Sequence, residues 1–246
     1  MHTTNTRNLF NLFGAKIALL LLFCLGTSVD SQAQIKGTYN YLDFANKPYY
    51  FGISLAYNTS QYKILRGSDF ILNDSVRSVV SPRGPGFNLG IIGNLKVGQY
   101  FDFRLMPTLS FSDRRLEYLM VQGEEDLVTK RIDGVYVELP FHVRYKSVPF
   151  KDIRLFAITG VKYSFDVASN SRTRQAATLV KVAPSDFAVE YGVGMQVFFP
   201  YFIFSPEFKV SHGLTNVLIY DQDLVFSSVL DKIFSRTFTI SFHFEG

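Results

Sequence analysis

The 246-residue sequence contains no tryptophan and only one cysteine. Cys24 lies inside the apolar run Ile17–Leu25, which we expect to be removed on export, so the mature chain is predicted to have no cysteine. This absence excludes disulfides, thiolate metal sites and a cysteine nucleophile. Lipidation is not predicted either, because Phe23 precedes Cys24, where a lipoprotein cysteine normally follows a small residue.

The N-terminal apolar run is also too short to cross a bilayer as a helix. It follows the basic residues Arg7 and Lys16, and Ser31-Gln32-Ala33 then supplies small residues at the two key positions of a cleavage site. These features are typical of a secretory signal peptide. We therefore predict a signal peptide at residues 1–33 and a mature chain that starts near Gln34.

No strong charge imbalance is present. The 25 basic and 21 acidic side chains give a net charge of +4, so nucleic-acid binding is not predicted. Aromatic residues make up 16% and hydrophobic residues 47% of the chain. That composition fits both a membrane barrel and a soluble barrel.

Strict alternation is the strongest pattern in the sequence. Every second residue from Val135 to Tyr145 is apolar or aromatic, whereas Glu138, His142 and Arg144 fall between them. Side chains alternate between the two faces of a strand, so this segment has one apolar and one charged face. The same pattern recurs in seven other segments: 49–58, 87–97, 101–112, 154–167, 187–199, 201–211 and 236–245.

The connections between these segments alternate in length. Gly98-Gln99, Ser147 to Asp152 and Pro200 are short, whereas four others are long and polar: 59–85, 113–131, 168–186 and 212–235. Together these features predict an all-β fold at 49–246, an eight-stranded antiparallel transmembrane outer-membrane β-barrel with short periplasmic turns and long extracellular loops. Residues 34–48 are expected to form a periplasmic lead-in.

Aromatic residues cluster near the short turns, where tyrosine replaces the missing tryptophan of an interfacial girdle. They are Tyr49, Tyr100, Tyr145, Phe199, Tyr201 and Phe244. The alternative is a soluble lipocalin-like barrel whose apolar face points inward, because the alternation alone does not tell inside from outside. The signal peptide, the loop asymmetry and the size of the apolar residues favour the membrane.

In a membrane barrel, the polar faces point inward. The candidate interior charge network is Arg104, Glu138, His142, Arg144, Lys162, Glu190, Glu207 and Lys209, with His243 on the same face. An eight-stranded barrel is only wide enough for side chains to fill it, and buried charges must be paired. Either a salt-bridge plug or a proton or substrate path fits this set, and no pore of porin width is expected.

No catalytic, metal or cofactor site is predicted. Glu138 and His142 share a strand face, but nothing supplies a convincing third metal ligand. No nucleophile-elbow sequence is present. The glycines between Gly86 and Gly93 lack the lysine and serine or threonine of a phosphate loop, so they are predicted to be strand glycines. Neither a cofactor nor a small-molecule substrate is expected.

Several segments, in order along the chain, carry a family resemblance. They include 46–52 (NKPYYFG), 109–118 (LSFSDRRLEY), 137–140 (VELP), 144–147 (RYKS), 160–169 (GVKYSFDVAS), 190–194 (EYGVG) and 205–214 (SPEFKVSHGL). The sequence resembles the PorT family, called SprT in gliding bacteria, which are outer-membrane barrels of the type IX secretion system of Bacteroidota. The resemblance implies a part in protein export, and in gliding motility where it occurs, and supplies no catalytic residues.

We therefore expect a non-enzymatic outer-membrane protein that contacts lipid and other secretion-system proteins. A general structural or adhesion barrel of the small OmpA/OmpX kind is the alternative, followed by the soluble lipid-binding barrel.

Overall fold

The computed structural model describes residues 40–66, 76–120, 127–167, 182–219 and 230–246. The predicted signal peptide lies outside these residues. The described elements are α2 (Tyr41–Ala45), β1 (Tyr49–Arg66), β2 (Val76–Val80), β3 (Gly84–Val97), β4 (Phe101–Leu105), β5 (Thr108–Met120), β6 (Leu127–Lys146), β7 (Ile153–Asp166), β8 (Ser185–Phe198), β9 (Ile203–Gly213) and β10 (Leu230–Glu245).

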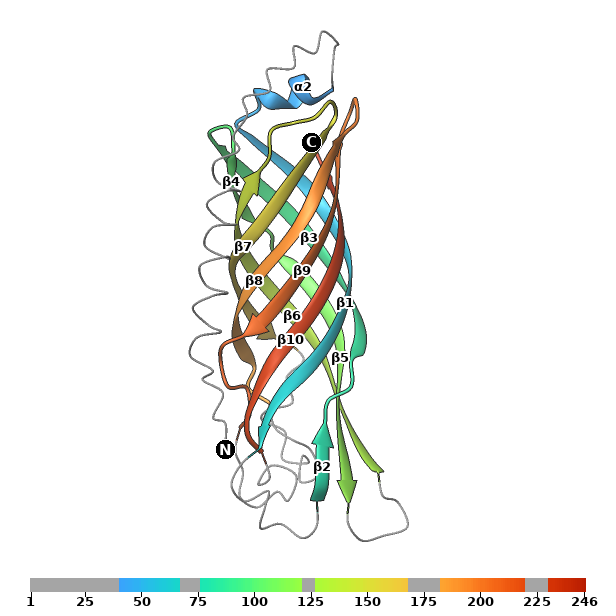
Figure 1. Ribbon diagram of the computed structural model, residues 1–246. Helices are drawn as coiled ribbons and strands as arrows, with labels where there is room; N and C mark the ends of the chain where they lie inside the picture. Colours follow the sequence, from blue (N-terminus) through green and yellow to red (C-terminus); the bar gives the residue numbers. More distant parts are fainter. Residues whose placement is uncertain (1–39, 67–75, 121–126, 168–181, 220–229) are drawn as a thin grey trace, which may run out of the picture. The chain divides into compact units, whose positions relative to one another are not determined.

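The strands form one antiparallel sheet that closes on itself. β1 pairs with β10 on one side and with β3 on the other, so the first and last strands complete the ring. Figure 1 shows the strands winding side by side around this ring. β2 pairs only with β5, and β4 and β5 together occupy one wall position between β3 and β6. The wall is therefore an eight-stranded barrel, as the alternation predicts.

Pro107 explains why one wall strand is divided into β4 and β5. Proline has no backbone N–H to donate to the ladder, and its carbonyl instead accepts a hydrogen bond from the Ile91 N–H at 3.0 Å. The register with β6 continues across the break, since Leu105 pairs with Phe141 and Thr108 pairs with Glu138. The break therefore interrupts hydrogen bonding without moving any side chain to the other face.

The two faces of the wall have opposite chemistry. Large apolar side chains such as Val193, which is 59% exposed, cover the outside, whereas Arg104 and Arg144 inside are 0% exposed. A soluble lipocalin-like barrel has the reverse arrangement, so that alternative is wrong. The apolar outer face and polar filling are those of an outer-membrane barrel.

Several strands continue well past the predicted segments at the end where the long connections lie. β1 runs to Arg66, β5 to Met120, and β6 and β10 begin at Leu127 and Leu230. Three connections that the sequence suggested were loops therefore contain strand: 59–85, 113–131 and 212–235. Outward positions there are mostly polar, as at Gln61, although Leu65 is apolar and exposed, so the contrast between faces that marks a membrane strand is lost.

A short helix closes the opposite end of the barrel. The carboxylate of Asp152 accepts a hydrogen bond from the Tyr41 N–H at 3.2 Å, and a carboxylate is favourable at a helix N-terminus. The chain reaches Pro48 soon after α2 ends, and the residue before a proline disfavours helix. The sequence predicts only a lead-in at 34–48, because five helical residues are too few to show a periodic pattern.

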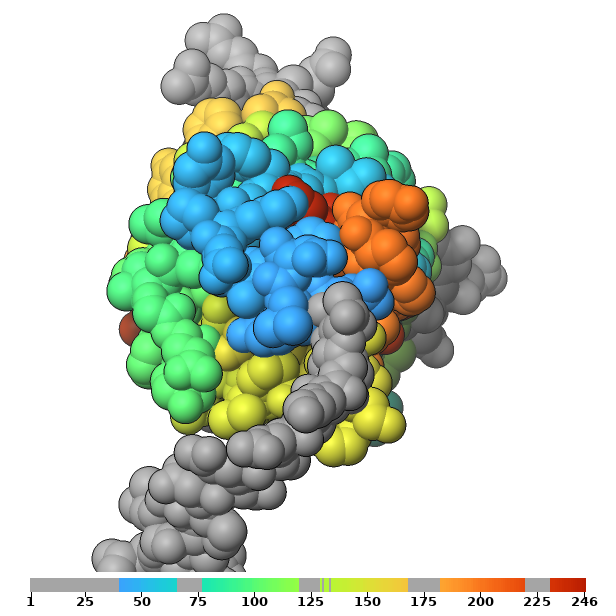
Figure 2. Space-filling model, turned by 90° about the horizontal axis from the view of Figure 1, so that it is seen from above, coloured from blue at the N-terminus to red at the C-terminus, as the bar shows by residue number. Residues whose placement is uncertain are grey.

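The side chain of Phe44 anchors α2 in the barrel end. Phe44 is buried against Phe198 and Ile203, which point inward from β8 and β9, and Tyr41 packs beside them. The Lys96 ammonium donates a hydrogen bond to the Phe44 carbonyl. Figure 2 views the barrel from this side, with the blue N-terminal segment lying over its end. No helix among the described residues is long and apolar enough to cross a membrane.

Candidate functional site

The eight residues of the candidate charge network all point into the barrel and are buried. Arg104, His142 and Arg144 have no exposed surface at all. Long charged side chains therefore fill the middle of the lumen. The ion pairs divide the network into two clusters, one centred on Glu190 and the other on Arg104 and Arg144.

Glu190 on β8 is the centre of the first cluster. Its carboxylate lies 2.7 Å from His142 Nε2, 3.3 Å from the Lys162 ammonium and 3.6 Å from the Lys209 ammonium. Lys162 is shared with Glu138 at 3.1 Å. Four strands, β6 to β9, thus contribute to one buried cluster in which each carboxylate has a basic neighbour, as buried charges require.

Gly160 makes the His142–Glu190 contact possible. It lies on β7 between these two residues, opposite His142 on one side and Glu190 on the other. A Cβ atom at this position would lie 2.8 Å from His142 Cδ2 and 2.1 Å from the Phe141 carbonyl oxygen. The missing side chain therefore lets the two partners meet across the strand between them.

Arg104 on β4 reaches across the lumen to the last strands of the ring. It forms an ion pair with Glu245 on β10 and lies 3.7 Å from Glu207 on β9, which is itself 3.5 Å from His243 Nε2. Arg104 Nε also donates to Asn94 Oδ1 at 3.3 Å. One guanidinium therefore links strands on opposite sides of the barrel.

Arg144 extends this second cluster toward the periplasmic end. It lies 2.9 Å from Asp102 and 3.7 Å from Glu245, and it donates a hydrogen bond to the Tyr50 hydroxyl. The guanidinium also covers the ring of Phe156, with 4.9 Å between Cζ and the ring centroid. These four partners lie on four different strands, β4, β10, β1 and β7.

The second cluster also contains three charged residues that were not among the predicted interior residues: Asp102, Lys146 and Glu245. Asp102 pairs with Lys146 as well as with Arg144, and Glu245 pairs with both arginines. All three are buried. Asp102 and Glu245 occupy the polar faces of their predicted segments, so extending the inward set to the strand ends would have found them.

Apolar side chains close the extracellular end of the lumen. Tyr62, Leu116, Tyr118, Val217 and Ile233 form a buried cluster with Val79 and Leu218. Below this cluster, the Arg114 guanidinium lies over the rings of Tyr62 and Tyr136 at 5.2 and 4.7 Å. The lumen is thus occupied at three levels, by this cluster, by the charge network and by Phe44 of α2.

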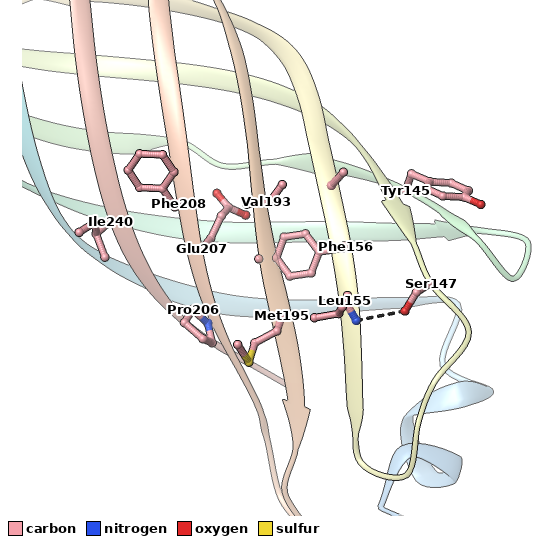
Figure 3. A pocket seen from close by; sticks show the side chains of 12 residues that line it. Tyr145, Ser147, Leu155, Phe156, Val193, Met195, Pro206, Glu207, Phe208 and Ile240 are labelled. Atoms are coloured by element: carbon pink, nitrogen blue, oxygen red, sulfur yellow. Dashed lines mark hydrogen bonds between the residues drawn. The ribbon is translucent and has the colours of Figure 1, made fainter. Parts of the chain in front are cut away.

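An apolar groove lies on the outer wall over β7, β8 and β9. It has a volume of about 690 Å³ and is bordered by Leu155, Val193, Met195 and Phe208 on the lipid side. Figure 3 shows these side chains around the groove, with Phe156 and Glu207 also on its lining. The ladder between β8 and β9 is interrupted here, where Pro206 has no N–H to donate.

The pair Glu138 and His142, considered above as part of a metal site, is divided between different partners. Glu138 contacts Lys162, and His142 contacts Glu190. Within the described ranges no group of three or more histidine, cysteine, aspartate or glutamate side chains is arranged to hold a metal ion. The interior groups are thus arranged to neutralise one another.

Comparison with solved structures finds other outer-membrane proteins at low identity. OprG from Pseudomonas aeruginosa is 9% identical over 80% of this chain and 95% of its own, with a TM-score of 0.45. Ail of Yersinia pestis, the attachment invasion locus protein, was solved with the heparin analogue sucrose octasulfate. It is 15% identical over 81% of this chain and 100% of its own, with a TM-score of 0.35. A search of curated protein sequences found no match.

The family match is more extensive. The family described as outer membrane protein beta-barrel domain matches residues 32–218, from the end of the predicted signal peptide to the segment after β9. The closed ring of strands, the apolar outer wall and the polar interior agree with this description. This chain therefore belongs to the outer membrane protein beta-barrel domain family.

Proposed function

We propose that this protein is a non-enzymatic small outer-membrane barrel that acts through contacts at its two ends and does not conduct solutes. The observation that carries the proposal is the filled lumen, in which Arg104 and Arg144 are fully buried and paired across the barrel. A barrel cross-linked in this way is a rigid support. Its extracellular segments and its periplasmic end with α2 are then the surfaces available to partners, with lipid around the wall.

Conductance across planar bilayers tests the absence of a solute path. The purified protein is expected to insert without a steady ion conductance, whereas a general porin inserted as a positive control conducts. A stable conductance of the wild-type protein would show that the interior opens, and the support role would then be wrong. A second measurement, the protection of the backbone amides of the barrel strands against hydrogen exchange, shows whether the inserted protein is folded.

A more specific proposal is that the barrel is a component of type IX secretion. It is supported by the ordered segments that resemble the PorT and SprT family, among them 46–52 and 109–118. On this proposal the partners are other secretion-system proteins, gliding depends on the barrel where it occurs, and neither nucleic acid nor a small-molecule substrate is involved. The general structural or adhesion role of small barrels does not require any of these partners.

A deletion strain separates the two proposals. Loss of surface-exposed cargo, restored by the wild-type gene, is expected if the barrel takes part in secretion. If cargo still reaches the surface while the outer membrane becomes fragile, the general structural role is correct and the secretion role is wrong. Co-purification from detergent-solubilised outer membrane then identifies which proteins contact the barrel ends.

A further inference from the structure

Four arginines lie across neighbouring strands on the outer face, at the extracellular boundary of the apolar wall. This arginine row consists of Arg83, Arg115, Arg131 and Arg236. Arg236 on β10 pairs with Gln61 on β1. Gly84, the first residue of β3, pairs with Ser60, the residue before Gln61, so Arg83 lies level with Gln61. Arg115 on β5 pairs with Arg131 on β6, and the row therefore crosses β10, β1, the start of β3, β5 and β6.

The outward side chains change character at this row. On the membrane side of the row lie the exposed or half-exposed Phe87, Phe111, Val135 and Phe238, with Asp113 directly beside the row. Beyond it most outward residues are polar, such as Lys63, Glu117 and Thr129, although Leu65 is also exposed there. The row therefore marks the depth at which the hydrocarbon ends and the headgroups of the outer leaflet begin.

Arg83 and Arg236 bracket one aromatic ring. Their guanidinium carbons lie 4.8 and 5.0 Å from the ring centroid of Phe238. Stacking on an aromatic face holds a guanidinium in place and leaves its N–H donors available. No acidic side chain among the described residues lies within ion-pair distance of either arginine.

The other half of the row is ordered by one carboxylate. Asp113 accepts a hydrogen bond from Arg115 Nε at 2.9 Å and lies 3.8 Å from Arg131 Nη2. The Ser81 hydroxyl accepts from the Tyr62 N–H at 2.9 Å and donates to the Arg115 carbonyl at 2.7 Å. These contacts fix the chain just before Arg83 between β1 and β5.

An apolar hollow lies next to the row on its membrane side. It has a volume of about 420 Å³, and Pro85, Phe87, Phe111 and Val135 contribute to its lining together with Asp113. The rings of Phe87 and Phe111 are stacked, with their centroids 4.5 Å apart. A fixed apolar hollow beside a row of cations matches an amphipathic molecule whose anionic part lies on the outer side of its hydrocarbon chains.

We propose that the arginine row and the adjacent hollow bind a phosphorylated, acylated glycolipid of the outer leaflet. Arginine donates paired hydrogen bonds to phosphate oxygens, and the row presents several guanidiniums at the depth of the headgroup. Arg83 and Arg236 bind the phosphate, and the hollow receives part of an acyl chain. This inference depends on the membrane orientation of the barrel and is independent of whether the protein takes part in secretion.

Binding of fluorescent lipid A to the protein in nanodiscs tests the proposal. Arg83→Gln together with Arg236→Gln is expected to weaken binding about tenfold or more, equivalent to losing at least one hydrogen bond to a charged group. The matched control is Lys151→Gln, which removes a cation stacked on Phe150 at the periplasmic end, 5.8 Å from its ring centroid. This control should bind like the wild type.

The lipid probes decide which chemistry is recognised. Dephosphorylated lipid A should bind about tenfold more weakly to the wild type, and it should show no further loss with the double variant. If lipid A binds equally to wild type and double variant, or if phosphatidylglycerol binds as tightly as lipid A, the site is not specific for the glycolipid and the proposal is wrong. Unchanged heat-resistant migration of the double variant in gels shows that folding is intact.

Discussion

The outer wall and the lumen of this barrel use side chains in opposite ways. Outside, residues such as Val193 and Phe208 face lipid, which is a uniform apolar solvent, so each contact can be replaced by another apolar one. Inside, Glu190 and Arg104 each depend on particular partners from several strands. Specific structure is therefore concentrated in the lumen, while the wall requires only the correct polarity.

The largest effect is expected from Glu190→Gln. The change keeps the shape of the side chain but leaves Lys209 and part of the charge of Lys162 unpaired, and breaking a buried ion pair costs about 3–5 kcal/mol. Urea unfolding from lipid vesicles measures the loss. Glu117→Gln on the half-exposed outer side of β5 is the control and should change stability by less than about 0.5 kcal/mol. Equal losses in the two variants would show that the lumen has no special demand for pairing.

Leu139→Arg tests the polarity of the wall itself. Leu139 is exposed near the middle of the outward apolar set from Val135 to Tyr145 on β6. A charge on the lipid face near mid-bilayer costs about 2–4 kcal/mol. The same unfolding assay applies, with Leu139→Phe as an apolar control expected to leave stability nearly unchanged. A variant that inserts and resists unfolding like the wild type would contradict the outward orientation of this face.

Phe44→Ala tests the junction between α2 and the barrel end. Removing the buried ring is expected to cost about 1.5–3 kcal/mol locally, because Phe198 and Ile203 lose their apolar cover. Hydrogen exchange at residues 41–45 should become faster, while exchange in the middle of β6 stays slow. The control is Leu42→Ala, since Leu42 is 54% exposed on the same helix. Faster exchange throughout the barrel would mean that α2 is needed for the whole fold.

The smallest loss of stability is expected from substitutions of two phenylalanines that border the same outer groove. Phe156 lies inside under the Arg144 guanidinium, and Phe208 lies outside in lipid. Phe156→Leu should cost about 1–2 kcal/mol, because it loses a desolvated cation–π contact. Phe208→Leu should cost less than about 1 kcal/mol, because lipid replaces the lost contact. If the two variants lose the same free energy of unfolding, the inner and outer faces of the wall do not differ in how strongly they depend on particular contacts.

The sequence predicted the strands correctly where one face meets lipid and the other meets the lumen, because this difference imposes an alternation of apolar and polar residues. Alternation along Val135–Tyr145 predicted the strand and its two faces, and the signal peptide and the loop asymmetry assigned the apolar face to the membrane. Prediction failed where that alternation is absent. The extensions of β1 and β5 are mostly polar on the outside, and α2 is too short for a helical pattern.

In the charge network, too, the sequence predicts one property and not another. The inward position of Glu138, His142 and Arg144 follows from their places on one strand, but their partners do not. His142 reaches Glu190 over Gly160, two strands away, and this contact depends on the register of β6, β7 and β8.

By itself the sequence determined which side chains share a face of each strand, because the direction of each side chain is a local property of an extended backbone. The signal peptide and the loop asymmetry then indicated that the apolar face meets lipid. Only the tertiary structure decided that Arg104 meets Glu245 and that Phe44 fills the barrel end. Those contacts join residues far apart in the chain, and closure of the ring brings them together. The width and stagger of the closed barrel set which charges meet across it.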